Sequence, residues 1–168
     1  MKSTSYLFTE PNLDLTDNLG RNAFQIMLKQ SLFSQKFLRR SLGALYGCVA
    51  PQSIDLQIDN KLVRIDAQRL EFLLVQIMYI ANLGAKAEHL IAFNASYFLR
   101  SFEHFPNQIV LEQRKKRSYI SSLLSKHEVN RLDPYNRKLF LRIRHGTYIL
   151  NPDLTVKQKN EMDHKFLD

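Results

Sequence analysis

The chain has 168 residues, a formal net charge of +8 and 45% hydrophobic residues, so it can bury a core within one domain, and we do not expect global disorder. The single cysteine, Cys48, excludes an internal disulfide bond. No stretch approaches the roughly 20 apolar residues that a membrane span needs, and the N-terminus lacks the apolar run of a secretory signal. We therefore expect a cytoplasmic protein without a membrane partner.

The N-terminal part of the chain predicts an irregular arm followed by helix. Residues 1–16 are mostly polar and show no sustained hydrophobic period, which predicts an arm. Asp17 or Asn18 can cap the helical segment that follows, because apolar residues then recur near helical spacing as far as residue 46. Serines near the middle of this segment predict a bend between two helices.

A β-hairpin is predicted next. Residues 54–58 alternate between apolar and polar side chains, and residues 61–65 return across the dipeptide Asp59-Asn60. Two turn-forming residues between alternating strands are typical of a tight hairpin. The sequence thus predicts a region at residues 17–66 that combines a helical segment with a β-hairpin.

A strongly apolar helix follows the hairpin. Asp66 is a candidate cap for a helix that ends near Leu83, just before Gly84. Its side chains leave almost no polar face, so it must be covered on several sides. We expect it to be the central core helix, and the sequence leaves open that residues 69–83 complete their burial in a homodimer.

Two further helices are predicted in the second half. Asn94 is a candidate cap for a helix that ends near Phe105, before Pro106. Ser118 is a candidate cap for a helix at residues 119–127. That helix has a narrow apolar stripe, Ile120, Leu123 and Leu124, opposite a polar face that contains Ser121, Ser122, Ser125 and Lys126. One side of it can therefore dock on a core while the other faces a partner.

A second hairpin is predicted at residues 138–150. The side chains of Leu139, Leu141 and Ile143 alternate with those of Phe140, Arg142 and Arg144, which predicts an apolar side and a basic side. Gly146 tolerates the positive φ of the tight turn His145-Gly146. The tail at residues 153–168 is polar, and we expect a short helix at residues 155–166.

The charge of the chain is concentrated in one segment. Between Gln113 and Arg144 there are ten basic and two acidic residues, a net charge of +8 that equals the charge of the whole chain. The remaining residues hold fourteen basic and fourteen acidic side chains and are therefore neutral. A basic segment on a neutral scaffold is typical of a surface that binds polyphosphate.

The order of the predicted elements is also informative. Helix, short strand, helix, helix and basic hairpin follow one another in the second half, and this order resembles that of winged-helix domains. The segment RIRHGTYILNP, Arg142 to Pro152, resembles the wing of winged-helix plasmid replication initiators. The resemblance implies that residues 67–152 are a winged-helix DNA-binding region, with residues 119–127 as the recognition helix. The connection at residues 107–117 is longer than a standard helix-turn-helix turn.

We therefore expect a mainly α (α+β) fold, with a helical core and two β-hairpins, whose C-terminal half is a winged helix-turn-helix. The expected function is binding of double-stranded DNA without catalysis, as a cytoplasmic or nucleoid-associated transcriptional regulator or replication initiator. The candidate DNA-binding residues are Arg114, Lys115, Lys116, Arg117, Ser118, Tyr119, Ser121, Ser122, Ser125, Lys126, Arg137, Lys138, Arg142, Arg144 and His145.

Three alternatives stay open. The basic hairpin can bind an acidic protein partner within a larger complex. A nuclease would need a general base, for which the pair His127-Glu128 or His145 beside Arg144 are candidates. The third alternative is binding of single-stranded RNA, whose bases stack on aromatic side chains, and Phe140 and Tyr148 alone are few for this. Since the sequence has no P-loop, no nucleophile elbow and no metal-ligand spacing, we expect no catalytic residue, no metal and no cofactor.

Overall fold

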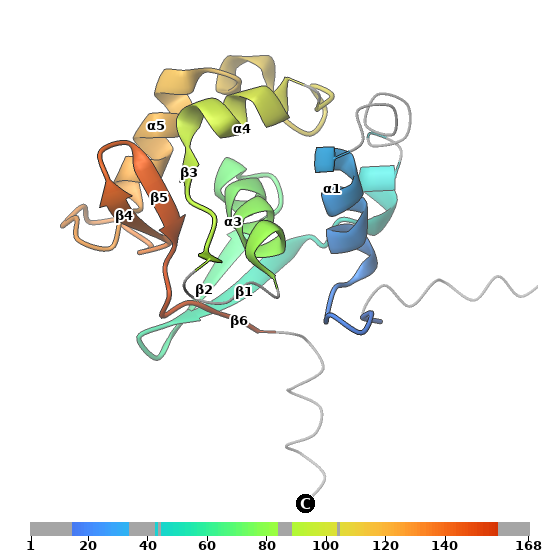
Figure 1. Cartoon of the computed structure of the whole chain (residues 1–168), viewed down its shortest axis with the longest axis horizontal. Coiled ribbons are helices and arrows are strands. Elements are labelled where there is room, and N and C mark those ends of the chain that lie inside the picture. The colour runs from blue at the N-terminus through green and yellow to red at the C-terminus, as the bar shows by residue number, and fades with distance from the viewer. Residues whose placement is uncertain (1–14, 34–42, 44, 84–88, 104, 158–168) are drawn as a thin grey trace, which may run out of the picture.

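The computed structural model describes residues 15–33, 43, 45–83, 89–103 and 105–157. This part of the chain is an α+β protein (Figure 1). Its helices include α1 (Ala23–Phe33), α3 (Leu70–Asn82), α4 (Ala95–Phe102), the 3-10 helix η2 (Glu112–Arg114) and α5 (Arg117–Lys126), and residues 45–49 are also helical. Its strands are β1 (Ser53–Ile58), β2 (Lys61–Asp66), β3 (Phe93–Asn94), β4 (Phe140–Arg144), β5 (Thr147–Leu150) and β6 (Thr155–Lys157). Among these residues, no helix has the length and apolar character to cross a membrane.

The strands form two antiparallel sheets, with the orders β2-β1-β6 and β3-β5-β4. The two predicted hairpins, β1–β2 and β4–β5, are confirmed. In the first, Asp59 and Asn60 have φ values of 47° and 62°, the positive φ at both central residues that a type I′ turn requires. The side chains of Ile54, Leu56 and Ile58 are buried, as their alternation predicted.

The prediction of a helix at residues 155–166 in the C-terminal tail is wrong for the residues that the structure describes. Residues Thr155–Lys157 form β6, which pairs with β1 and completes the first sheet. β-branched residues favour a strand, and β1 offers a free edge for them to pair with. Residues 158–168, and residues 1–14 of the predicted arm, lie outside the described residues.

Helix α3 lies at the centre of the molecule, between α1 and the β1–β2 hairpin on one side and β5 on the other (Figure 1). Its side chains from Leu70 to Met78 are all buried within the single chain. The core position predicted for this helix is therefore confirmed, and the burial of residues 70–78 does not depend on the homodimer through residues 69–83 that the sequence left open. The predicted cap was wrong, because Asp66 ends β2, and Arg69 occupies the N-cap position without a side-chain hydrogen bond.

The first helix also begins later than predicted. Asp17 accepts hydrogen bonds from the backbone of Leu19 and Arg21 and so stabilises a turn that precedes the helix. The Asn22 side chain accepts from the amide of Gln25, and the Gln25 side chain accepts from the amide of Asn22. This reciprocal pair satisfies two amides at the start of the helix, as in a capping box, and explains why α1 begins at Ala23.

Helix α4 begins where the sequence predicted. The Asn94 side chain accepts a hydrogen bond from the amide of Tyr97 at 2.9 Å, which confirms the predicted N-cap. The helix ends at Phe102 rather than near Phe105. Its aromatic side chains continue inward from β3: Phe93 stacks on Phe98, and Phe98 packs against Phe102. These rings join α4 to the central core.

The second hairpin does not divide into the predicted apolar and basic sides. Phe140 is fully buried, whereas Ile143 is 51% exposed. After Arg142 the register shifts: Arg142 pairs with Tyr148 and Arg144 pairs with Thr147, so Ile143 is an extra residue that has no partner opposite it. Arg142 shares a face with Phe140 by strand alternation and with its partner Tyr148, and this face contains the buried rings.

The Asn94 cap provides a test of this part of the fold. The substitution Asn94→Ala leaves the amide of Tyr97 without its acceptor, and we expect the free energy of unfolding to fall by about 1 kcal/mol. Asn130→Ala is the matched control, because Asn130 is exposed and makes no side-chain hydrogen bond within the described residues. Urea denaturation followed by circular dichroism measures both. Equal stability of the two variants would contradict the capping role.

Candidate nucleic-acid interface

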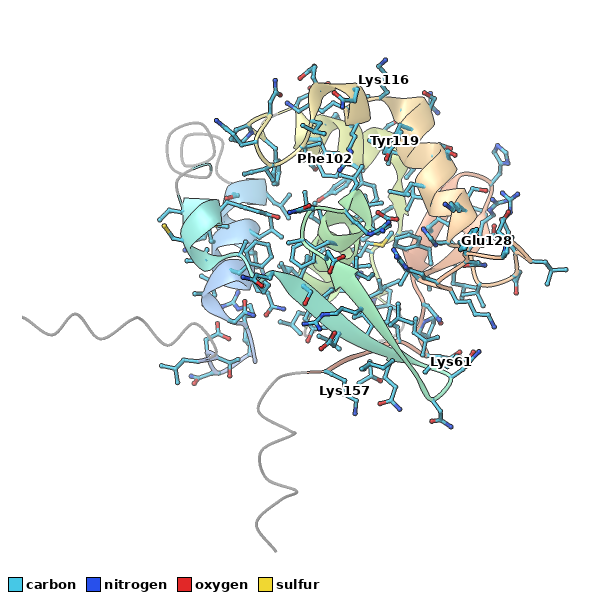
Figure 2. The ribbon with its side chains drawn as sticks, turned by 180° about the vertical axis from the view of Figure 1, so that it is seen from behind. Lys61, Phe102, Lys116, Tyr119, Glu128 and Lys157 are labelled. Atoms are coloured by element: carbon cyan, nitrogen blue, oxygen red, sulfur yellow. The ribbon has the colours of Figure 1, made fainter. Side chains whose placement is uncertain are left out.

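Helix α5 has a buried face and an exposed polar face. It packs against α4 through Ile120 and Leu124, which are fully buried. The helix begins at Arg117 with Lys116 at the N-cap, so the predicted cap Ser118 is wrong; Ser118 lies one residue inside the first turn and is exposed. The exposed side chains of α5 are Arg117, Ser118, Tyr119, Ser121, Ser122 and Lys126. Figure 2 shows Lys116 and Tyr119 at the end of the molecule opposite Lys157.

The basic run at residues 114–117 is divided between two roles. Arg114 donates to the backbone oxygen of Gln68 at 2.9 Å. The ammonium group of Lys115 donates to the backbone oxygen of Phe105 at 2.8 Å and to the side chain of Asn107, and it pairs with Glu112 at 3.3 Å. These two side chains therefore hold the connection between α4 and α5, in which η2 lies. Lys116 and Arg117 are exposed and make no side-chain hydrogen bond or ion pair within the described residues.

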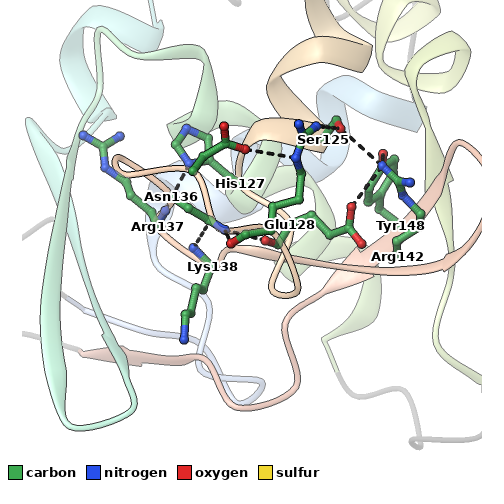
Figure 3. A network of polar contacts seen from close by, with 10 residues as sticks. Ser125, His127, Glu128, Asn136, Arg137, Lys138, Arg142 and Tyr148 are labelled. Carbon is green, nitrogen blue, oxygen red and sulfur yellow. Dashed lines mark hydrogen bonds and ion pairs between the residues drawn. The ribbon is translucent and has the colours of Figure 1, made fainter.

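Arg142 joins the β4–β5 hairpin to the end of α5 (Figure 3). One of its terminal nitrogens lies 2.9 Å from Glu128 Oε2, 2.9 Å from Tyr148 Oη and 3.2 Å from Ser125 Oγ. Its guanidinium also lies over the ring of Tyr148, with its carbon 5.3 Å from the centroid. Glu128 is only 7% exposed, so its charge needs a close partner. Arg142 is thus engaged by the protein itself.

Other cations of the segment also pair with carboxylates. Arg131 lies 2.9 Å from Asp133, and Arg137 and Lys138 lie 3.6 Å from Glu71 and Asp59, respectively. With Lys115 and Arg142, five of the ten basic residues in the segment are ion-paired. The others are Arg114, Lys116, Arg117, Lys126 and Arg144, of which all but Arg114 are exposed. The charge available to a partner is therefore smaller than the sequence indicates.

The predicted site residues do not all lie together. The structure gathers Lys116 and the exposed residues of α5 on one helix, and it places Ser125 against Arg142 of the hairpin. Arg144 and His145 are exposed at the hairpin turn, where the guanidinium of Arg144 donates to Thr147 at 3.3 Å. Arg137 and Lys138 lie in the loop before β4, each next to a carboxylate.

A buried polar pair lies beside this interface. His127 is 2% exposed, its Nε2 is 3.3 Å from Glu71 Oε1, and its Nδ1 accepts the amide of Arg137 at 3.2 Å. Both ring nitrogens are therefore engaged, and Glu128 has a different partner, so His127 and Glu128 do not form the acid–base pair considered for a nuclease. Within the described residues there is no cluster of side chains suited to a metal ion.

The pKa of Glu71 reflects these contacts. Burial by itself would raise the pKa of this carboxyl. The hydrogen bond from His127, the hydrogen bond from the backbone amide of Glu71 itself and the electrostatic effects of His127 and Arg137 together outweigh burial, so the pKa of Glu71 is lowered. The carboxylate form is thus the one that the fold stabilises.

Sequence reasoning missed the loop between α5 and β4. Asn136 holds this loop, because its side-chain nitrogen donates to the backbone oxygens of Glu128 and Arg131 and its side-chain oxygen accepts from the amide of Lys138. Between the loop and α5 is a recess of about 300 Å³ lined by Ser122, Ser125, Lys126, Arg131 and Asp133. The turn residues Asp133-Pro134 in the sequence predict a loop, but not its position beside α5.

The role of Arg142 can be tested against that of Arg144. Arg142→Ala leaves the buried carboxylate of Glu128 unpaired, and we expect the free energy of unfolding to fall by about 2 kcal/mol, less than for a fully buried pair because Arg142 is 35% exposed. Arg144→Ala removes an exposed side chain and should change it by less than about 0.5 kcal/mol. Urea denaturation gives both values. Similar values for the two variants would show that Arg142 does not hold the hairpin in place.

The lowered pKa of Glu71 predicts a pH dependence. A carboxyl whose pKa is lower in the folded protein stabilises it above the unfolded pKa, about 4.3 for glutamate, and this stabilisation is lost as the pH falls toward the folded pKa. The free energy of unfolding of the wild type should therefore fall more steeply between about pH 6 and pH 3 than that of Glu71→Gln. Glu103→Gln, at an exposed position directly after α4, should follow the wild type. Parallel curves for wild type and Glu71→Gln would refute this.

Comparison with known proteins gives no further guide to the role of this surface. No protein-family model matches the chain, and no curated protein and no solved structure matches it. The interface is therefore defined by the residues and contacts described above, with the exposed face of α5 at its centre.

Proposed function

We propose that the protein binds double-stranded DNA, with α5 in the major groove and the β4–β5 hairpin beside it on the duplex, and that it does so without catalysis. The order of elements from α3 to β5 supports the resemblance to winged-helix domains. Strand β3 pairs with β5, so the short strand before α4 and the basic hairpin belong to one sheet. In this arrangement α5, which we propose as the recognition helix, and the proposed wing are linked through Ser125 and Arg142.

The exposed polar face of α5 is the observation that carries the proposal. Serine hydroxyls and the phenol of Tyr119 on this face can donate to and accept from base edges. Lys116 and Arg117 lie at the N-terminus of the helix, where free amides and a partial positive charge also favour phosphate. Lys126 lies at the other end. The helix thus presents neutral polar groups between unpaired cations.

The ion pairs limit how many phosphates the protein contacts. Four cations of the basic segment are both exposed and free of ion pairs, Lys116, Arg117, Lys126 and Arg144. Four phosphate contacts give a slope of about −4 for the logarithm of affinity against the logarithm of salt concentration. Arg142, Arg137 and Lys138 then serve to position the hairpin and the preceding loop. The resemblance of the hairpin to a replication-initiator wing favours a role as a transcriptional regulator or replication initiator.

One observation favours a second function, contact with another protein. Leu132 is 100% exposed and Tyr135 is 79% exposed, both in the loop that Asn136 holds. A fixed loop with exposed apolar side chains is typical of a protein contact. The cations of this loop pair with Asp133, Glu71 and Asp59, so it has less charge to offer to DNA than α5 has.

Fluorescence anisotropy with a labelled duplex of random sequence, at several salt concentrations, tests the DNA proposal. We expect a slope of about −4 for the wild type and about −2 for Lys116→Gln/Arg117→Gln, which removes two contacts. Lys61→Gln/Lys157→Gln is the matched control, because both lysines are exposed on the first sheet, away from α5 (Figure 2). It should keep the wild-type slope.

Three outcomes would contradict the proposal. Absent or salt-insensitive binding by the wild type would remove DNA as the partner and leave the protein contact. Equal loss of affinity in the control and the α5 variant would show that binding does not depend on this face. Cleavage of the duplex in the presence of Mg²⁺ would show that the protein is an enzyme.

A further inference from the structure

We infer that the recess between α5 and the following loop is a binding site for one backbone phosphate of DNA. This inference rests on the proposed function, because it identifies a phosphate contact of the same interface. The recess is lined by Ser122, Ser125, Lys126, Arg131 and Asp133. Its walls combine the last turn of α5 with the start of the loop that precedes β4.

The hydrogen bonds of Ser125 determine what the recess can bind. The hydroxyl oxygen of Ser125 accepts from Arg131 Nη1 at 2.6 Å and from Arg142 Nη2 at 3.2 Å. A serine hydroxyl has two acceptor positions and one proton to donate. Since both acceptor positions are used, Ser125 can only donate to a group in the recess. The hydroxyl of Ser125 could otherwise donate or accept, and its contacts with the two arginines leave it only as a donor.

The other walls also supply donors. Lys126 and Ser122 are exposed and make no side-chain hydrogen bond or ion pair within the described residues. Arg131 uses Nε for Asp133 and Nη1 for Ser125, and a guanidinium has five N–H groups, so further N–H groups remain. Asp133 is the one carboxylate on the wall, and Arg131 neutralises it at 2.9 Å. An excess of donors over acceptors favours an anion.

The position of the recess favours a phosphate of a groove-bound duplex. Helix α5 has ten residues and is therefore about 15 Å long, similar to the width of the major groove, about 12 Å. Lys116 and Arg117 lie at its N-terminus, and the recess lies at its C-terminus. A helix across the groove would thus place its two ends near the two strands that border the groove. The N-terminal cations would meet one backbone, and the recess the other.

Salt dependence separates a phosphate contact from a neutral one. In Lys126→Gln the slope of log affinity against log salt should become less negative by about 1, because one charge contact is lost. In Ser122→Ala affinity should fall while the slope stays unchanged, because a neutral donor is lost. Lys157→Gln, on β6, is the control and should match the wild type in both measurements. Circular dichroism checks that each variant is folded.

Single methylphosphonate substitutions locate the contact. In a duplex selected from a random pool by the wild type, each phosphate is replaced in turn by a neutral methylphosphonate. One position should lower the affinity of the wild type about tenfold but change that of Lys126→Gln little, because the contact is already lost. The same measurement with Lys116→Gln should identify a second phosphate position, at which substitution no longer lowers the affinity of that variant. The two positions should lie on opposite strands of the duplex.

The outcomes distinguish this inference from the function on which it rests. If the wild type does not bind the duplex, the proposed function is overturned. If the wild type binds with the expected slope, but Lys126→Gln has the same slope and the same response to every methylphosphonate, the recess does not hold a phosphate. In that case DNA binding by α5 still stands, with its phosphate contacts elsewhere.

Discussion

The contact between Arg142 and Glu128 is the interaction on which the candidate interface most depends. Glu128 is buried two residues after the end of α5, and its charge requires a partner, which within the described residues is Arg142 of the hairpin, at 2.9 Å. The same guanidinium reaches Ser125 on α5 and Tyr148 on the neighbouring strand (Figure 3). The angle between hairpin and helix is therefore set by electrostatics as well as by packing. It adds a side-chain link to the backbone hydrogen bonds by which Phe140 pairs with His127 and Val129 after the helix.

The same principle explains the distribution of the basic residues. Cations paired with a carboxylate hold loops and strands together, whereas those on the outer face of α5 form no ion pair within the part of the chain that the structure describes. A net charge of +8 in one segment therefore describes two populations with different roles. Substitution of all the cations would weaken the fold and the surface together, so the two roles are separable only residue by residue.

Local patterns predicted much of the fold, and long-range contacts explain what they missed. The hairpin around Asp59-Asn60, the Asn94 cap and the buried central helix followed from periodicity and turn residues within a few positions. The polar face of α5 was predicted in the same way. The ion pairs were not, because the partner of His127 is 56 residues away in the chain, and the buried carboxylate that Arg142 meets, Glu128, lies outside the hairpin. Neither feature leaves a periodic signal in the sequence.

Strand β6 has a consequence for how the chain is divided. After the basic hairpin the chain returns to pair with β1, so the first sheet contains strands from the first half of the chain and from the end of its described part. The core is correspondingly continuous, with Phe24 of α1 and Tyr148 of β5 in one cluster. A fragment cut after Pro152 would leave an unpaired strand edge at β1, ready to pair with another molecule. The part that we propose binds DNA is thus not a detachable module, and shortened versions of the protein would be prone to aggregate.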